Sequence, residues 1–322
     1  MSPDLPPALR SAIDREMAGV SRQSMAERTA ATTTAYRAGG TSASAIRGRD
    51  DALAYALARL PATYAACAEV FSEAGRMIPG FSPQSLLDAG CGPGGGSWAA
   101  REAWPGLSQV TWLDANPPFL ELAQRLAAGS ALAASTVRRG DLLAGAYPGA
   151  DLVLASYALA EIAETDLARV TGHLWAACSG VLALVEPGTP AGYARLLMAR
   201  RVLIDAGAVV AAPCPHHEAC PLVGPDWCHF NVRLARSRDH RLAKGAEVPY
   251  EDEKYAYLLV ARPGLGIALR HPRVLDRPRV GKPGIELKLC GPDGVERRFV
   301  ARRDKPAHAV ARRLDWGDVH EG

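Results

Sequence analysis

The sequence has few cysteines and no long apolar run, and each shortage excludes a class of protein. No apolar stretch reaches the roughly 18 residues that a membrane-spanning helix needs, so we expect no such helix. The N-terminal stretch contains no apolar core of a secretory signal, and its Asp4, Asp14 and Glu16 are atypical of a mitochondrial presequence. We therefore expect a soluble cytoplasmic protein.

Cysteine is scarce, and what there is lies close together. The chain has seven cysteines, an odd number, and nothing indicates secretion, so a disulfide framework is not expected. Three cysteines and three of the eight histidines lie in one short stretch, APCPHHEACPLVGPDWCHF (212–230). Clustered thiols in a cytoplasmic protein indicate a metal site.

The charge is unevenly distributed along a chain whose composition is globular, at 48% hydrophobic and 22% charged residues. Residues 1–213 carry 17 Lys and Arg against 19 Asp and Glu, whereas residues 231–313 carry 20 against 10. A net charge of +10 over that segment favours a polyanion such as RNA as partner, although a solvated basic surface would give the same count.

Strand and helix patterns alternate through the middle of the chain, which is typical of a doubly wound α/β fold with a parallel sheet. The expected strands are 85–90, 109–114, 135–141, 150–159 and 179–188, and the expected helices between and after them are 95–104, 117–128, 164–178 and 191–207.

Regions of different pattern flank this segment. Residues 1–78 are expected to be helical, with a polar linker at 32–50 and a helix break at Pro61. Tyr36, Arg37 and Arg47 of the linker either form a solvated loop or contact a ligand. We expect a nucleotide-binding domain at 79–210.

The third region, 211–322, is expected to hold the cysteine-rich insert, a strand at 251–262 that returns to the sheet, and a basic β appendage. The appendage is expected to contain two strands within 284–303, joined by a Gly-Pro-Asp-Gly turn.

The glycine-rich turn in LLDAGCGPGGGSW (86–98) follows the first strand and opens a helix. Glycines let the backbone turn sharply and approach a ligand, and the helix N-terminus adds favourable dipoles. Asp114, at the end of the next strand, is placed to accept hydrogen bonds from ribose hydroxyls. The pattern alone does not specify which nucleotide is bound, and a domain of this type that binds no nucleotide is also compatible with it.

Residues 80–210 resemble class I S-adenosylmethionine-dependent methyltransferases. The resemblance implies that Gly90, Gly92 and Gly94 flank the methionine part of the cofactor. Asp88 would hold the amino group, Asp114 the ribose and Asp141 the adenine region, with Ser156 and Tyr157 near the methyl acceptor.

Motifs that would identify a methylation chemistry are missing. No N/D-P-P-Y/F motif follows the fourth strand, where the chain has ASYALAEI, and NPPF (116–119) follows the second strand instead. No cysteine nucleophile follows the fourth or fifth strand. Cys67, Cys91 and Cys178 are expected to be small buried residues. Proximity alone can drive methyl transfer, so catalysis stays undecided.

The cysteine spacing favours an iron–sulfur cluster over zinc. Cys214, Cys220 and Cys228 lack the paired knuckles of structural zinc sites, and Cys290 is a fourth candidate ligand. His216, His217 and His229 keep zinc as an alternative, and unligated cysteines are a third.

The chain from about residue 35 onward resembles the methyltransferase-like small-ribosomal-subunit assembly family of mitochondrial ribosomes and bacterial relatives. The resemblance rests on the motifs LLDAGCGPGGGSWAA, DLVLASYALAEI, LVEPGTPAGY, CPHHEACPL with DWCHF, EKYAYLLVAR and the ending RRLDWGD. The resemblance implies a [4Fe–4S] cluster on Cys214, Cys220, Cys228 and Cys290.

The same resemblance implies a factor that binds S-adenosylmethionine and small-subunit rRNA and assists ribosome assembly or translation. The expected rRNA contacts are Arg297, Arg298, Arg302, Arg303, Lys305, Arg312 and Arg313. An active rRNA methyltransferase and a zinc-stabilised small-molecule methyltransferase are the alternatives.

Overall fold

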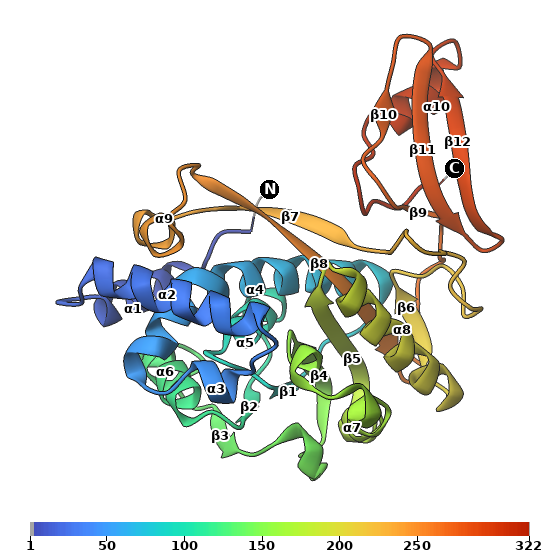
Figure 1. The fold of residues 1–322 in the computed structure, drawn as a ribbon. Coiled ribbons are helices and arrows are strands. Elements are labelled where there is room, and N and C mark those ends of the chain that lie inside the picture. The colour runs from blue at the N-terminus through green and yellow to red at the C-terminus, as the bar shows by residue number, and fades with distance from the viewer. Residues whose placement is uncertain (1–2, 322) are drawn as a thin grey trace.

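The structure is a computed structural model that describes residues 3–321 (Figure 1). Its helices are α1 (Pro7–Glu16), α2 (Arg22–Arg37), α3 (Ser42–Ala45), α4 (Arg49–Met77), α5 (Gly95–Ala103), α6 (Pro117–Ala127), α7 (Glu164–Ala177), α8 (Pro190–Asp205), α9 (Arg238–Lys244) and α10 (Lys305–Ala311), with 3-10 helices η1 (Leu142–Ala144) and η2 (Leu159–Glu161). Its strands are β1 (Ser85–Ala89), β2 (Gln109–Asp114), β3 (Thr136–Arg139), β4 (Ala150–Ser156), β5 (Cys178–Pro187), β6 (Val209–Ala212), β7 (Phe230–Ala235), β8 (Tyr250–Ala261), β9 (Arg273–Val274), β10 (Arg279–Val280), β11 (Gly284–Gly291) and β12 (Gly294–Ala301). None of the helices in the described part has the length and apolar character to cross a membrane.

The main sheet has the strand order β3-β2-β1-β4-β5-β8-β6, with β7 also paired to β8. Strands β1 to β5 are parallel, and β8 is antiparallel to β5, β6 and β7. This confirms the predicted α/β fold of class I methyltransferase type, including the strand that returns to the sheet. Winding in both directions from β1 leaves a crevice at the carboxyl ends of β1 and β4, where such folds bind ligands.

Each face of the sheet has its own core. Successive side chains of a strand point to opposite faces. Leu86 therefore belongs to a core with residues of α4, α5 and α6, whereas Leu87 belongs to a core with residues of α7 and α8. The two helical layers fix the carboxyl edge of the sheet from both sides.

Helix α4 runs unbroken for 29 residues, so the predicted break at Pro61 is wrong. A proline removes one backbone donor from a helix, but packing can offset that loss. Pro61 is buried, and Leu60 packs closely on the start of α5, where a Cβ on Gly95 would lie 3.4 Å from Leu60 Cγ.

The predicted polar linker at 32–50 is also mostly helical. Helix α2 extends to Arg37, and α3 covers Ser42–Ala45. Thr29 and Thr32 of α2 are buried, and the helix packs against α4 and α9. Tertiary contact therefore outweighs the low helix propensity of the threonines.

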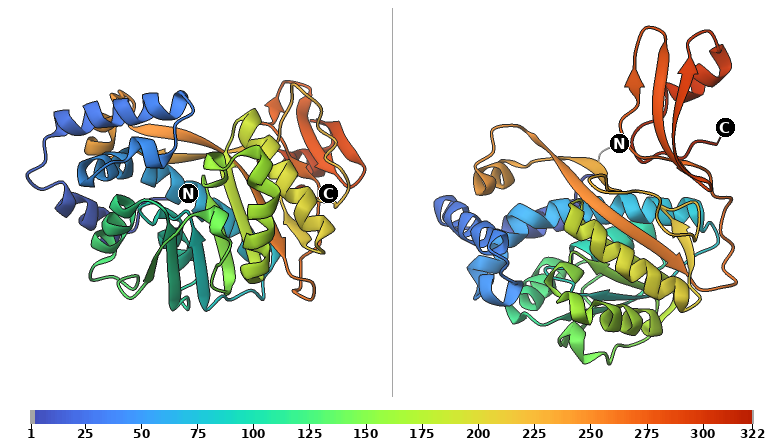
Figure 2. Two further views of the ribbon diagram at one scale, coloured as in Figure 1. Left: turned by 60° about the horizontal axis from the view of Figure 1, so that its bottom comes forward. Right: turned by 45° about the vertical axis from the view of Figure 1, so that its right-hand side comes forward.

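An appendage formed by β9 to β12 and α10 projects from the body of the molecule (Figures 1 and 2). The predicted hairpin is present, with Gly291 of β11 opposite Gly294 of β12. Its small core contains Val274, Ile285, Leu287, Leu289, Val300 and Ala311.

A buried ion pair fastens the appendage to the body. Glu73 of α4 and Arg273 of β9 are 5% and 4% exposed, and Arg273 Nη2 donates to Glu73 Oε1 at 2.5 Å. The same guanidinium donates to the carbonyl oxygens of Pro213 and Gly317 at 3.3 and 2.9 Å. Four distant segments of the chain thus meet at one charged group.

Replacing Glu73 with glutamine is expected to lower the free energy of unfolding by about 3 kcal/mol, because it leaves a buried guanidinium without a counter-charge. Urea unfolding measures the change. Glu286→Gln removes the partner of the exposed Arg279 and Arg297 and is the control, with an expected cost below about 1 kcal/mol. Equal costs for the two variants would contradict the anchoring role of Glu73.

Candidate functional site

The glycine-rich turn needs its glycines. Gly90, Gly92 and Gly94 have φ values of 74°, 52° and 87°, which side chains disfavour. A Cβ on Gly90 would lie 2.6 Å from the Cβ of Ala158. The turn therefore leads the backbone from β1 into α5 along a path that only glycine takes without strain.

Asp114, at the end of β2, is tied to this turn. Its Oδ2 accepts a hydrogen bond from the Gly92 N–H at 2.8 Å, and its Oδ1 accepts one from the Asn116 N–H at 2.8 Å. Burial raises the pKa of this carboxyl, and the two hydrogen bonds oppose that rise. Each oxygen keeps a lone pair for a further donor such as a ribose hydroxyl.

Asp88, at the end of β1, is fully buried beneath α5. Its Oδ2 accepts the Ser97 hydroxyl hydrogen bond at 2.6 Å, whereas its Oδ1 has no partner in the described part of the chain. Burial raises the pKa of Asp88 to about 6. An unpartnered buried oxygen favours a donor group beside it, as a cofactor amino group would supply.

The structure places Ser156 beside Asp88. A Cβ on Gly96 would lie 3.5 Å from both Ser156 Oγ and Asp88 Oδ2. Asp141 lies at the same edge of the sheet after β3, where it is exposed and caps η1 by accepting the Leu143 N–H at 2.8 Å. Of the seven predicted cofactor residues, three glycines thus form the turn, Asp88 and Ser156 lie beside the start of α5, Asp114 is hydrogen-bonded to the turn, and Asp141 lies one strand further out.

A cavity of about 880 Å³ lies between the N-terminal helices and the carboxyl ends of β4 and β5. Tyr36, Arg37 and Arg59 line one wall, and Tyr157 and Arg195 line the other. Of the three linker residues for which ligand contact was an alternative, Tyr36 and Arg37 line this cavity. Arg47 instead donates to the carbonyl of Ser44.

Tyr157 has an unusual backbone geometry that the sequence did not predict. Its φ is 58°, the only positive value at a non-glycine residue in the described part of the chain. Its hydroxyl donates to Glu253 Oε1 at 3.0 Å, and Arg59 donates to the same oxygen at 3.3 Å. Such backbone strain is concentrated at functional sites. No local sequence signal reveals this group, because it joins β4, β8 and α4.

The segment before α4, residues 36–46, lies across the edge of the sheet and is called the strap. Glu161 accepts hydrogen bonds from the Ser42 N–H and hydroxyl at 3.1 and 2.7 Å and from the Tyr36 hydroxyl at 3.3 Å. Asn116 donates to the Ile46 carbonyl at 3.0 Å. Two residues at the sheet edge thus hold the strap over the candidate cofactor cleft.

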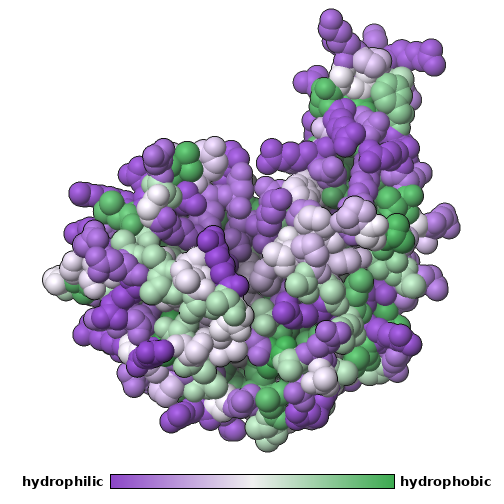
Figure 3. Space-filling model, viewed as in Figure 1, coloured by the Kyte–Doolittle hydropathy of each residue, from purple (hydrophilic) through white to green (hydrophobic). Residues whose placement is uncertain are grey.

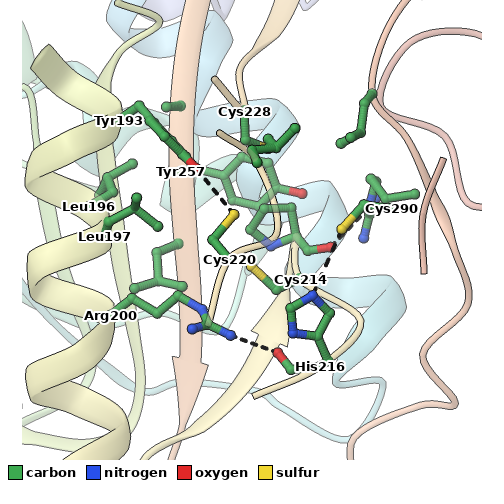
Figure 4. A pocket seen from close by; sticks show the side chains of 16 residues that line it. Tyr193, Leu196, Leu197, Arg200, Cys214, His216, Cys220, Cys228, Tyr257 and Cys290 are labelled. Atoms are coloured by element: carbon green, nitrogen blue, oxygen red, sulfur yellow. Dashed lines mark hydrogen bonds between the residues drawn. The ribbon is translucent and has the colours of Figure 1, made fainter. Parts of the chain in front are cut away.

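The four predicted metal ligands come together at one place. Cys214, Cys220 and Cys228 lie in the loop between β6 and β7, Cys290 lies on β11, and all four line one cavity (Figure 4). Across residues 3–321, however, no group of three or more His, Cys, Asp or Glu side chains is arranged to hold a metal ion. The four cysteines therefore lie close together, and metal binding by them stays a prediction.

The surroundings of the cysteines suit an anionic group. Tyr193 donates its hydroxyl hydrogen bond to Cys220 Sγ at 3.1 Å, and Arg200 and Arg273 line the same cavity. Burial raises the pKa of the Cys290 thiol to about 12 and raises those of Cys214 and Cys228. A cationic metal centre would reverse this effect by stabilising thiolates.

Two of the three histidines of the stretch have partners other than the cysteines. His217 Nε2 accepts the Val210 N–H at 2.9 Å, and His229 stacks on Trp227 with ring centroids 4.8 Å apart. His216 Nε2 lies 3.9 Å from Cys290 Sγ, so His216 is the histidine that lies beside a predicted metal ligand. Cys67, Cys91 and Cys178 are buried, as predicted.

The predicted RNA contacts lie on the appendage and are exposed, except that Arg298 is half-buried. Arg297 pairs with Glu286 at 2.7 Å and Arg298 with Glu296 at 2.5 Å. Within residues 3–321 no acidic side chain forms an ion pair with the others, which are Arg302, Arg303, Lys305, Arg312 and Arg313.

Glu186→Gln is expected to flatten the pH dependence of stability. Burial raises the pKa of Glu186 from 4.5 to about 8, and its Oε2 has no partner in the described chain. Between these values the folded state binds more protons than the unfolded state. The free energy of unfolding therefore falls as pH rises, by at most ~1.4 kcal/mol per pH unit from this group.

Urea unfolding at pH values between about 5 and about 8 measures that slope. Glu247→Gln, at an exposed position of the same charge, is the control. An unchanged slope in Glu186→Gln would contradict the buried, protonated state of Glu186.

Solved structures with a similar fold include magnesium protoporphyrin IX methyltransferase from Synechocystis with bound SAH. It is 15% identical with a TM-score of 0.42, and the match covers 62% of this chain and 83% of that one. A putative RNA methyltransferase from Pyrococcus horikoshii is 13% identical with a TM-score of 0.40, and covers 64% and 87% of the two chains.

Sequence relatives are closer. The human mitochondrial ribosome assembly protein METTL17 is 30% identical over 290 residues, covering 83% of this chain and 62% of the relative. The Rsm22-cox11 tandem protein 2 of Schizosaccharomyces pombe is 25% identical over 327 residues, covering 83% and 42%. The chain thus spans less than two thirds of each of these relatives. Because the pattern of the mitochondrial small ribosomal subunit Rsm22 family matches residues 49–321, the chain belongs to that family.

Proposed function

We propose that this protein is an S-adenosylmethionine-binding factor that binds rRNA of the small ribosomal subunit, assists its assembly or translation, and carries a [4Fe–4S] cluster. The observation that carries the proposal is the meeting of four cysteines at the base of a basic appendage. Membership of the Rsm22 family and the human relative named as a ribosome assembly protein support the ribosomal part.

The cofactor part rests on the crevice at the carboxyl edge of the sheet. Gly90, Gly92 and Gly94 let a ligand approach the backbone, Asp114 offers acceptors for ribose hydroxyls, and Asp88 Oδ1 offers one for an amino group. When bound, S-adenosylmethionine would supply an electrophilic methyl group. This chain's residues would orient it and exclude water with the strap that Glu161 holds.

The cluster part rests on the donor set and its charge. Four thiolates around a cubane of charge +2 leave a net charge of about −2, and thiolates are the usual ligands of such clusters. Arg200 and Arg273, which line the cavity, are placed to offset that charge. The cluster would join the loop between β6 and β7 to β11 and thereby stiffen the base of the appendage.

Metal analysis after anaerobic purification tests the cluster. We expect about four iron and four sulfide per chain, lost in Cys220→Ser because one ligand is removed. Cys178→Ser, a cysteine buried outside the cavity, is the matched control and should keep the full content. One zinc per chain and no sulfide would overturn the cluster.

Co-sedimentation with small ribosomal subunits tests the ribosomal role. Binding is expected to survive Asp88→Ala, which removes a cofactor contact, and to be lost in Cys220→Ser, which loosens the appendage. Circular dichroism checks that both variants are folded. No association of the wild-type protein at low salt would refute the role.

An active rRNA methyltransferase is the second candidate, and the strained Tyr157 beside the large cavity favours it. Methyl transfer to small-subunit rRNA that Asp88→Ala abolishes would establish this candidate over a factor without turnover.

A further inference from the structure

An exposed phenylalanine stands out on the appendage. Phe299 of β12 is 57% exposed, more than any other aromatic side chain in the described part of the chain, where Tyr250 follows at 40%. A single exposed apolar residue is ordinary in soluble proteins. Its support and its neighbours distinguish this one.

The ring of Phe299 lies against β11 at a position where that strand has a glycine. Phe299 lies opposite Glu286 of β11, and Gly284 lies two residues further along that strand. A Cβ on Gly284 would lie 2.7 Å from Phe299 Cζ and 2.2 Å from the carbonyl oxygen of Val300. The missing side chain therefore leaves room for the ring against the backbone of β11, while more than half of the side chain stays open to solvent.

Positive charge borders the ring on the same face of the small sheet. Residues that pair across antiparallel strands point to the same side, as do alternate residues of one strand. Arg279 pairs with Glu286, and Arg297 lies two residues from Phe299. Both guanidinium groups share the single carboxylate of Glu286, at 3.6 and 2.7 Å, so this face keeps a net positive charge.

The wider appendage has the same sign. Residues 270–313 contain 13 Lys and Arg against 5 Asp and Glu. The visible face of the appendage is mainly hydrophilic, with small apolar patches (Figure 3). This charge favours a polyanion over an apolar protein partner.

We infer that Phe299 is a stacking platform for one unpaired nucleobase, with Arg279 and Arg297 contacting the phosphates on either side. This rests on the proposed rRNA binding and adds to it the form of RNA that the appendage takes. A paired base hides its faces in the stack, so the ring selects a loop, bulge or single-stranded end.

Fluorescence anisotropy with a labelled oligoadenylate of about 12 nucleotides tests the inference on the full chain, since a segment of that length covers a typical single-strand site. A ribose-phosphate oligonucleotide of equal length without bases carries the same charge. Phe299→Ala is expected to weaken binding of oligoadenylate about tenfold, the effect of losing one stacked base. It should leave binding of the abasic chain unchanged.

Three further variants separate stacking from other contacts. Phe299→Trp keeps a π face and should bind like wild type, whereas Phe299→Leu keeps only apolar area and should bind like Phe299→Ala. Val310→Ala, at an exposed position on α10, is the matched control and should change nothing. Arg297→Ala should lower the slope of log K against log salt by about one, and Phe299→Ala should not.

The outcomes distinguish this inference from the proposed function. Wild-type protein that binds neither oligonucleotide at low salt overturns both. Salt-dependent binding that is the same for Phe299→Ala and wild type overturns the platform and leaves RNA binding standing. Equal affinities of Phe299→Leu and wild type also overturn stacking, because an apolar contact then suffices.

Discussion

The attachment of the appendage depends on one buried guanidinium. Arg273 is in contact with Glu73, with the backbone beside Cys214 and with the backbone near the C-terminus, so one charge fixes four segments. A buried ion pair often adds little net stability compared with apolar residues of the same size, yet removing one partner is costly. The pair therefore matters chiefly for where the appendage sits.

Such an anchor is needed because the appendage has little core of its own. Six buried residues form its interior, and small units of this size are marginal without a cross-link, metal or partner. The cysteine cavity lies beside the anchor and includes Arg273 in its wall. The ion pair and the proposed cluster would act on the same joint, one through charge and the other through covalent bonds to metal.

Local patterns in the sequence were enough to predict the fold and much of the candidate site. The turn at Gly90–Gly94 and the carboxylate of Asp114 are encoded within short stretches that follow strands. Contacts between distant segments were not predictable in the same way. Arg273 lies 200 residues from Glu73, and Glu253 lies 96 residues from Tyr157, so no spacing rule connects them. The small strands β9 and β10 were missed because two residues show no periodicity.

Helix α4 spans the distance between the two candidate sites. Arg59 faces the large cavity from the first half of the helix, and Glu73 holds the appendage near its C-terminal end, 14 residues away, or about 21 Å along a straight helix. No loop interrupts α4 between these two residues. The spacing of the cavity and the joint is therefore set by the fixed rise of one helix, which works as a ruler between them.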